Sequence, residues 1–301
     1  MTGSSTWASA GDLARRVEDQ GFSGMLYTET GQVPWMQIAA AAMAAPSLTF
    51  TTGIAVAFPR SPMVSAQVAW ELAGETSGKF RLGLGSQVKG HVVRRYSADF
   101  DRPARRLHDY VMAVKACLRA FRGEERLSHE GEFYNLSLLP DTWKPRSHDF
   151  GNIKVDISSV GPLMNNVAGQ VADGVHVHPM HSMHYIENRL LPEVAQGAES
   201  AGRNASDIDL IVPVFAVAGD TAEERAPWVH RAKTQIAFYG TTPNYAFQFE
   251  DLGFEGVTKA LGDKMKAGDL QGMADTISDE MLDHFALVST WDGMADRLKE
   301  R

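Results

Sequence analysis

The chain has 301 residues, of which 44% are hydrophobic, with 29 Lys and Arg against 37 Asp and Glu. This length is enough for one large α/β barrel or for two modest domains with a sizeable core. The formal charge of -8 argues against a nucleic-acid partner, because phosphate binding favours a basic stripe and the sequence has none.

Cysteine content and apolar runs narrow the class of protein further. The single cysteine, Cys117, excludes an intramolecular disulfide framework and fits a reducing cytoplasm. No apolar stretch approaches the ~18 to 20 residues that a membrane helix needs. Since the N-terminus has no basic segment followed by an apolar one, no secretory signal is expected. The sequence therefore predicts a cytoplasmic protein without a membrane partner.

Strand-like and helix-like segments alternate along most of the chain. The expected strands are 24–29, 48–57, 79–85, 153–159, 174–178, 208–218 and 285–289. The expected helices are 12–20, 35–45, 62–76, 103–121, 162–172, 183–201, 222–238 and a last one from Asp292. Repeated βα units with buried strands indicate a mostly parallel sheet, and eight such units close a barrel.

Seven strand–helix pairs are clear, so a (β/α)8 barrel needs one more strand at the start of the chain. Only residues 4–10 (SSTWASA) are available for it, and they predict a degenerate, shortened first strand. Two segments interrupt the alternation: 122–152, with a hairpin and a Pro/Trp loop, and 243–283, which reads as helical. Because no low-complexity linker occurs, we expect one domain over residues 1–301 with these two insertions.

Candidate acid/base residues lie at strand ends, where catalytic groups of a parallel barrel gather. His176 and His178 alternate with valines, so both imidazoles are expected on the inner face, with Asp156 beside His176 as an acid/base pair. Glu29 ends its strand and is a third candidate. The alternatives are one ordinary core histidine with one loop histidine, a structural ion pair between Lys154 and Asp156, and a capping role for Glu29.

Two further patterns concern ligands. The segment HVHPMHSMH, residues 176–184, places four histidines close together. However, the H-x-H pattern is common by chance, and no nearby cysteine offers a further metal ligand, so we expect no metal site. The segment 158–162 (SSVGP) follows an expected strand and begins an expected helix, where free N–H groups favour the binding of a phosphate. The alternative is that Gly-Pro simply starts the helix. The GLGSQ segment at 83–87 lets a flat ligand approach the backbone.

These segments resemble the luciferase-like monooxygenase superfamily, and within it the branch that depends on the deazaflavin coenzyme F-420. The resemblance rests on TGIAVAFPRSPMVSAQVAWELAGETSGKFRLGLGSQVKGHVVRRY, SSVGPLMNNVAGQVADGVHVHPMH, VPVFAVAGD, QIAFYGTTPNY and DEMLDHFALV, which occur in that order. It spans roughly residues 11 to 300. It implies a (β/α)8 barrel, usually a homodimer, that binds FMN or the deazaflavin at the C-terminal mouth.

The resemblance also implies roles for particular residues. The strand 53–57, including Ile54 and Ala55, would form a bulge behind the cofactor ring, and Gly85, Ser86 and Gln87 would line the ring or its tail. Ser159, Val160, Gly161 and Pro162 would take the cofactor phosphate. His176 and His178 would face the substrate. The basic run Lys89, His91, Arg94 and Arg95 would meet an anionic tail, unless it is only a solvated helix face.

The chain departs from the family pattern at the cofactor end. The expected first strand is reduced to a short segment rich in Ser and Thr. The segment after the second strand, 29–34 (ETGQVP), lacks the histidine that family members commonly have at this position. The strand before the phosphate loop reads VDISSVGP, so that Asp156 stands where relatives have an apolar or small residue.

Three functions follow. The favoured one is an F-420-dependent or, second, FMN-dependent oxidoreductase or monooxygenase, with a histidine of pKa near neutrality as proton donor. It would act on a sizeable apolar small molecule, because the insertions are rich in aromatics. The alternatives are a barrel without a redox cofactor that performs acid/base chemistry, such as an isomerase, lyase or cyclase, and a non-catalytic partner subunit.

Overall fold

A computed structural model describes residues 6–301 of the chain. The described residues fall into two compact units that interleave along the sequence. The first unit comprises Met1–Ser159, of which residues from 6 onward are described, with Leu163–His176 and Val194–Leu210. The second comprises Val160–Pro162, Val177–Glu193 and Ile211–Arg301. The single domain expected over 1–301 stays a prediction, and each unit is treated by itself below.

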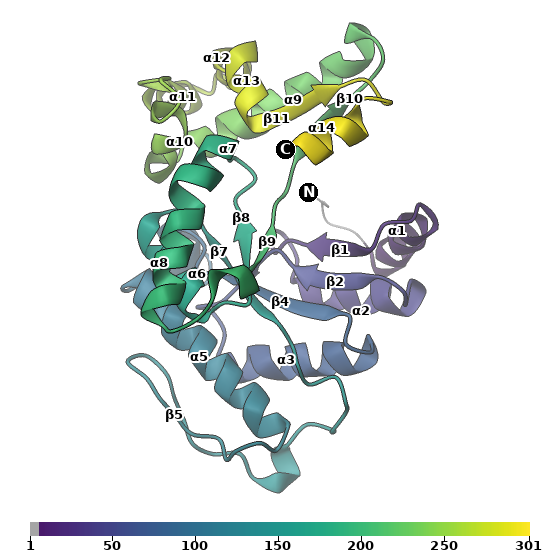
Figure 1. The fold of residues 1–301 in the computed structure, drawn as a ribbon, viewed down its shortest axis with the longest axis vertical. Coiled ribbons are helices and arrows are strands. Elements are labelled where there is room, and N and C mark those ends of the chain that lie inside the picture. Colours follow the sequence, from purple (N-terminus) through teal and green to yellow (C-terminus); the bar gives the residue numbers. More distant parts are fainter. Residues whose placement is uncertain (1–5) are drawn as a thin grey trace. The chain divides into compact units, whose positions relative to one another are not determined.

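A seven-stranded sheet forms the centre of the first unit, in the order β1-β2-β4-β7-β8-β9 with β3 beside β4 (Figure 1). The pairs β1–β2, β2–β4 and β4–β7 are parallel, with Tyr27 opposite Thr52 and Leu82 opposite Val155. The strands are β1 (Gly24–Tyr27), β2 (Thr49–Thr52), β3 (Ala55–Val56), β4 (Phe80–Gly85), β7 (Val155–Ser159), β8 (Gly174–Val177) and β9 (Asp209–Ile211).

Helices alternate with these strands, as the sequence predicts for a parallel sheet. Residues at the start of helix α3 (Pro62–Glu75) favour the helix locally. The Ser61 side chain accepts a hydrogen bond from the Met63 amide, and Pro62 follows at the first helical position, where its fixed φ favours a helix. Helices α3 and α5 lie side by side (Figure 1). The helices are α1 (Trp7–Asp19), α2 (Pro34–Ala44), α3 (Pro62–Glu75), α4 (Lys89–Arg94), α5 (Pro103–Phe121), α6 (Pro162–Val171) and α8 (Leu191–Ser200).

The weak first strand expected at 4–10 is wrong for residues 6–10, the part of it that the structure describes. Thr6 caps helix α1 through its side chain, which accepts from the Ser9 amide at 3.2 Å, and residues from Trp7 onward are helical. The alanines of this segment favour a helix, and Ala10 is buried. Ser4 and Ser5 lie outside the described residues.

Two expected strands are each divided in the structure. The segment 48–57 forms β2 and β3, separated at Gly53–Ile54, whose peptide bond is cis. The segment 208–218 forms β9 and β10 (Phe215–Ala218), which belong to different sheets. Pro213 stands between these two strands and cannot donate to a strand ladder.

The helix expected at 183–201 also divides. It begins as α7 (Met183–Tyr185), continues as a π-helical turn at Ile186–Leu190 and ends as α8. Pro192 lies just beyond the turn. Since proline has no N–H to donate to the preceding turn, a local change of helix type is the physical consequence.

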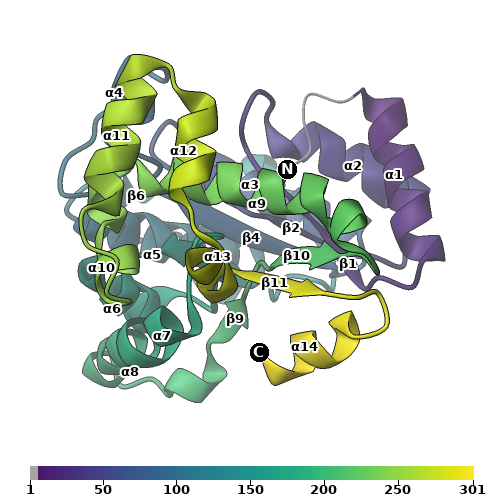
Figure 2. The ribbon, with the colours of Figure 1, turned by 90° about the horizontal axis from the view of Figure 1, so that it is seen from above.

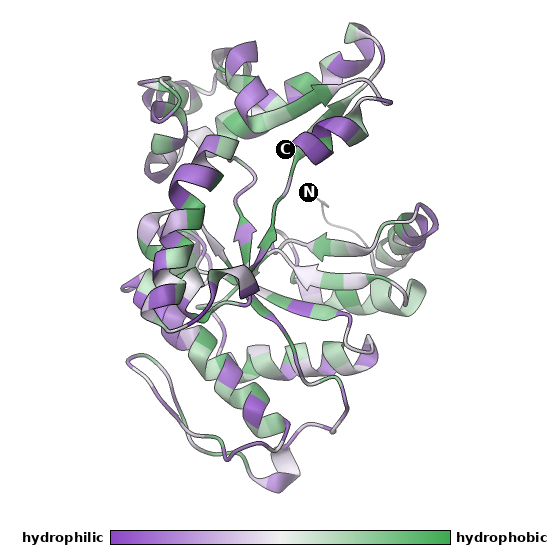
Figure 3. Ribbon diagram, viewed as in Figure 1, coloured by the Kyte–Doolittle hydropathy of each residue, from purple (hydrophilic) through white to green (hydrophobic). Residues whose placement is uncertain are grey.

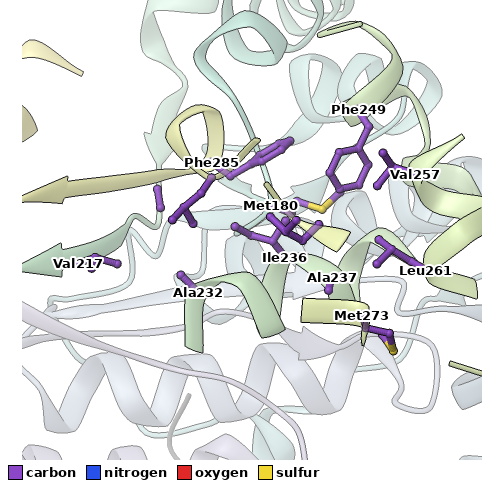
Figure 4. Packing of buried hydrophobic residues seen from close by; sticks show 13 residues of the cluster. Met180, Val217, Ala232, Ile236, Ala237, Phe249, Val257, Leu261, Met273 and Phe285 are labelled. Carbon is purple, nitrogen blue, oxygen red and sulfur yellow. The ribbon is translucent and has the colours of Figure 1, made fainter. Parts of the chain in front are cut away.

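The second unit is built on a parallel pair of strands, β10 and β11 (Ala286–Ser289), with Phe215 opposite Ala286 (Figure 2). Buried side chains from its strands and helices form one apolar cluster that includes Ile236, Phe249 and Phe285 (Figure 4). The helices are α7, α9 (Ala222–Gly240), α10 (Phe247–Glu250), α11 (Val257–Ala267), α12 (Leu270–Thr276), α13 (Asp279–Phe285) and α14 (Met294–Glu300). The helical character expected for 243–283 is confirmed.

The first insertion holds the expected hairpin, β5 (His129–Glu130) and β6 (Asn135–Leu136), which pair antiparallel, followed by a short 3-10 turn at Asp141–Trp143. Asp109 of α5 fixes the hairpin, because its carboxylate accepts from the amides of Phe133 and Tyr134 and lies 2.7 Å from His129 Nε2. Within residues 6–301, no helix is long and apolar enough to cross a membrane.

Candidate functional site

One face of the first unit's sheet carries its polar and glycine residues in rows. Side chains alternate along a strand, and the contacts place Arg81 against Asp156, Gly83 against His176 and Gly85 against Ser158. Figure 3 shows the hydrophilic band of β8 among the hydrophobic segments of the sheet. The rows thus run from the start of the strands toward their carboxyl ends, where a parallel sheet presents its functional groups.

The first row is an ion-pair network in which Asp156 is buried, Arg81 is half-buried, and the side chains of Asp209 and Lys154 are exposed. The Arg81 guanidinium donates to both oxygens of Asp156, at 2.8 and 2.7 Å, and to Asp209 at 2.7 Å. Asp156 is fully buried, so this bidentate pair supplies the counter-charge that a buried carboxylate requires. Lys154 binds Asp209 at 2.6 Å. The alternative of a Lys154–Asp156 ion pair is therefore wrong, because Asp156 pairs with Arg81 and Lys154 pairs with Asp209.

The second row contains His176, which lies beside Asp156 as expected. His176 Nε2 is 3.8 Å from Asp156 Oδ2, and within the described chain it has no hydrogen-bond partner. Burial lowers the pKa of His176 to about 4, against an opposing effect of Asp156. The expected pKa near neutrality is wrong for this histidine, because desolvation disfavours the imidazolium. His176 is neutral at pH 7.

The third row brings together two of the predicted cofactor residues. A Cβ added at Gly85 would lie 2.5 Å from Ser158 Oγ and 2.7 Å from Ile54 Cδ1, so the absence of a side chain at Gly85 lets the side chains of Ile54 and Ser158 meet there. Ala55 pairs with Leu84. Beyond β4, Gln87 has a positive φ of 58° and its side chain accepts from the Val88 amide at 2.9 Å.

Glu29, predicted as a catalytic candidate, lies just beyond β1 and is buried. Its carboxylate accepts from Arg60 at 2.6 and 2.7 Å and from the Val56 amide at 2.8 Å, while the Glu29 amide donates to Ile54 O at 3.3 Å. Glu29 thereby holds the chain on both sides of Ala55, at Ile54 and at Val56. This arrangement favours a positioning role over proton transfer, and the predicted capping role is not what the contacts show.

The predicted phosphate segment begins at Ser159, whose side chain is buried and whose Oγ has no hydrogen-bond partner within residues 6–301. In the second unit, Val160 O accepts from Tyr185 OH at 2.7 Å. Gly161 has open space where a Cβ would stand, and Pro162 begins α6. The phosphate role of this segment stays a prediction.

His178 belongs to the second unit and packs against two tyrosine rings, Tyr239 and Tyr245, with centroids 4.7 Å away in each case. Its Nδ1 accepts from the Met180 amide at 3.1 Å. Burial lowers the pKa of His178 to about 4 and that of the buried His181 to about 4 as well. Across the described part of the chain, no three His, Cys, Asp or Glu side chains form a group that could hold a metal ion.

The basic run lies on and after α4. Lys89, His91 and Arg94 are exposed, and the Arg95 guanidinium donates to Thr30 O and stacks on the ring of Tyr96. Both interpretations of the run, an anionic tail site or a solvated face, remain compatible with these positions.

Two half-buried arginines that organise the site, Arg60 and Arg81, were not predicted from the sequence. Arg81 could have been found, since a charged residue between Phe80 and Leu82 in a buried strand demands a partner. Arg60 lies in the loop before α3 and has no such signal.

The three buried histidines make stability depend on pH. An unfolded histidine takes up a proton below about pH 6.5, whereas the folded chain binds those protons only near pH 4. The free energy of unfolding is therefore expected to fall as the pH drops from about 6.5 to 5, by up to about 1.4 kcal/mol per pH unit for each histidine. Urea unfolding across this range measures it. A His176→Asn variant should show a smaller slope, and an unchanged slope would contradict the burial effect.

Known proteins resemble this chain along nearly all of its length. The family model described as luciferase-like monooxygenase matches residues 1–301. An uncharacterized protein of Mycobacterium tuberculosis is 34% identical over 98% of this chain and 86% of its own. The 5,10-methylenetetrahydromethanopterin reductase of Methanolobus tindarius is 23% identical over 95% of this chain and 84% of its own.

A solved structure shows the same fold. The coenzyme F-420-dependent tetrahydromethanopterin reductase of Methanopyrus kandleri superposes with a TM-score of 0.80 at 18% identity, covering 98% of this chain and 86% of that one. The predicted luciferase-like α/β fold of the TIM-barrel type is thus confirmed, and enzymes of this kind are oxidoreductases or monooxygenases. The chain belongs to the luciferase-like monooxygenase family.

Proposed function

We propose that this protein is an oxidoreductase or monooxygenase that uses the deazaflavin coenzyme F-420, with FMN as the second candidate, and that acts on a bulky, largely apolar small molecule, by hydride transfer in the F-420 case. The proposal rests on the meeting of Ile54, in the break between β2 and β3, with Gly85 and Ser158 near the carboxyl ends of β4 and β7, in a chain of the luciferase-like family. When bound, the cofactor supplies the redox chemistry, while the protein supplies binding and orientation.

The residues present fit such a cofactor. Ile54 would bound its flat ring, and Gly85, which has no side chain, leaves the room in which Ile54 and Ser158 meet beside it. Glu29 and Arg60 keep the segment behind the ring in place through the Val56 amide. Ser159 has a buried hydroxyl without a hydrogen-bond partner among the described residues, which is the donor that a phosphate oxygen at segment 159–162 would use.

A neutral His176 suits the removal of a proton better than its donation. With its pKa lowered to about 4 by burial, the imidazole accepts a proton at pH 7 and donates none as imidazolium. In the proposed reaction His176 would take the hydroxyl proton of a substrate alcohol, and the carbon that bears this hydroxyl would give its hydride to the oxidised cofactor, if bound. Nδ1 of His178 already accepts from the Met180 amide, so His176 is the proposed base.

The principal alternative is acid/base catalysis without a redox cofactor. It is supported by the pairing of Asp156 with Arg81 inside the sheet, which adds buried charge at the position where the family pattern is apolar. In that case His176 would act alone as a base, and the protein would bind neither F-420 nor FMN.

A pair of substitutions at Gly161 tests the phosphate segment. Gly161 has a negative φ and free space where a Cβ would stand, so Gly161→Ala should leave stability within about 0.5 kcal/mol. Gly161→Asp adds a negative charge and is expected to weaken binding of F-420 or FMN at least tenfold, measured by fluorescence titration. Equal cofactor binding by the wild type and both variants would contradict a phosphate-binding role of this segment.

Partners and location extend the proposal. A homodimer in the cytoplasm is the expected state, from the family resemblance and the single reduced cysteine. Sedimentation velocity of the purified chain tests the dimer, and a monomer at micromolar concentration would contradict it.

A further inference from the structure

We propose that Arg81 and Asp156 are positioning residues that fix the imidazole of His176 as the tautomer with its proton on Nε2, which leaves Nδ1 as the proton acceptor. Two atoms carry the inference: Nε2 of His176 and Oδ2 of Asp156, 3.8 Å apart. The tautomer itself is independent of the proposed function, whereas its use as a base rests on that function.

The geometry around Nε2 favours an N–H there. This nitrogen is buried and no hydrogen-bond partner reaches it from the described chain, so the nearby carboxylate is the charge it faces. At 3.8 Å the contact is too long for a hydrogen bond. Nevertheless, an N–H dipole pointing at a carboxylate is attracted, while a nitrogen lone pair in the same place is repelled, and the partner of one ring nitrogen decides which nitrogen carries the proton.

Arg81 keeps Asp156 in place for this role. Its guanidinium binds both oxygens of Asp156 from β4 and also binds Asp209 from β9, and Lys154 adds a second cation on Asp209. The negative charges of the two carboxylates equal the positive charges of the two cations. Burial, aided by the charge of Arg81, keeps His176 neutral, and the carboxylate directs the position of the proton without adding a second one.

Gly83 makes the approach possible. A Cβ at this position would lie 2.5 Å from His176 Nε2, so the ring edge that bears Nε2 occupies space that any other residue would fill. The ring is thus held with Nε2 toward the interior of the sheet and Asp156. The orientation follows from packing as well as from charge.

Nitrogen-15 NMR of the protein labelled at histidine tests the proposal, because the two imidazole nitrogens give different shifts in each tautomer. The chain supplies its own references. In His148, Nε2 donates to Trp70 O at 2.9 Å and Nδ1 accepts from the Phe150 amide at 3.1 Å, which gives the Nε2–H form. In His181, Nδ1 donates to His178 O at 2.8 Å, which gives the Nδ1–H form.

At neutral pH, His176 is expected to match His148. A match to His181, or two protonated nitrogens, would overturn the proposal without any variant. Asp156→Asn then removes the charge and keeps the size, with Arg81 retaining Asp209. In this variant the ratio of the Nε2–H to the Nδ1–H form of His176 should fall at least tenfold.

Asp109→Asn is the matched control, because Asp109 contacts His129 at 2.7 Å; it should change His129 and leave His176 unaltered. An unchanged His176 in Asp156→Asn would show that the carboxylate has no positioning role. Neither measurement requires a cofactor. Failure to bind F-420 or FMN would therefore count against the proposed function alone, and a wrong tautomer against this inference alone.

Discussion

Replacing Arg81 by alanine is expected to lower the free energy of unfolding by about 3–5 kcal/mol, because it leaves a buried charge without its counter-ion. Asp156 is fully buried and receives both of its guanidinium hydrogen bonds from Arg81. The variant also frees Asp209 from one of its two cations. Urea unfolding followed by circular dichroism at pH 7 measures the change.

An exposed ion pair provides the matched control. Arg119 contacts Glu125 at 2.6 Å with both side chains substantially exposed, and Arg119→Ala should cost no more than about 1 kcal/mol. The double variant Arg81→Met with Asp156→Leu should recover much of the loss, because an apolar pair carries no desolvation cost. If Arg81→Ala were as mild as Arg119→Ala, the network would not stabilise the sheet as described.

Gly83→Ala is the second substitution with a large expected effect. Its Cβ would lie 1.9 Å from Thr52 O, a backbone atom of the neighbouring strand, and 2.5 Å from His176 Nε2. The strands cannot separate without loss of the bonds between Thr52 Oγ1 and Gly83, at 2.7 and 2.9 Å. A loss of about 3 kcal/mol or more in unfolding free energy follows, again by urea unfolding.

Gly31→Ala is the control for this substitution. Gly31 has free space around it and no positive φ, so alanine there should change stability by less than about 0.5 kcal/mol. Equal stabilities of the two variants would mean that β2, β4 and His176 do not pack as closely as their contacts indicate.

The order of strands and helices could be predicted from the sequence because each element has its own periodicity and end signals. Helix α5 was expected over residues 103–121 and spans Pro103–Phe121, since Pro103 opens it and apolar residues recur at helical spacing. The resemblance implied a bulge within 53–57, but the residue pattern alone indicated neither the division at Gly53–Ile54 nor that at Pro213. Apolar composition continues across both sites, and the pairing that ends each strand comes from residues distant in sequence.

The candidate site could be predicted only in part. The approach of Asp156 to His176 followed from the alternation of side chains on β7 and β8. The identity of the partner of Asp156 did not, because Arg81 is 75 residues away in the chain. The lowered pKa of His176 was also missed, since burial is a property of the packed molecule that a single strand does not reveal.

A fluorescence titration of the purified protein with F-420 and with FMN, each oxidised and reduced, tests the proposed oxidoreductase function. Saturable micromolar binding of at least one cofactor is expected, with F-420 bound more tightly than FMN. Gly161→Asp is the variant expected to lose that binding. No saturable binding of either cofactor would contradict the proposed oxidoreductase function and leave His176 as the candidate base of a reaction without a redox cofactor.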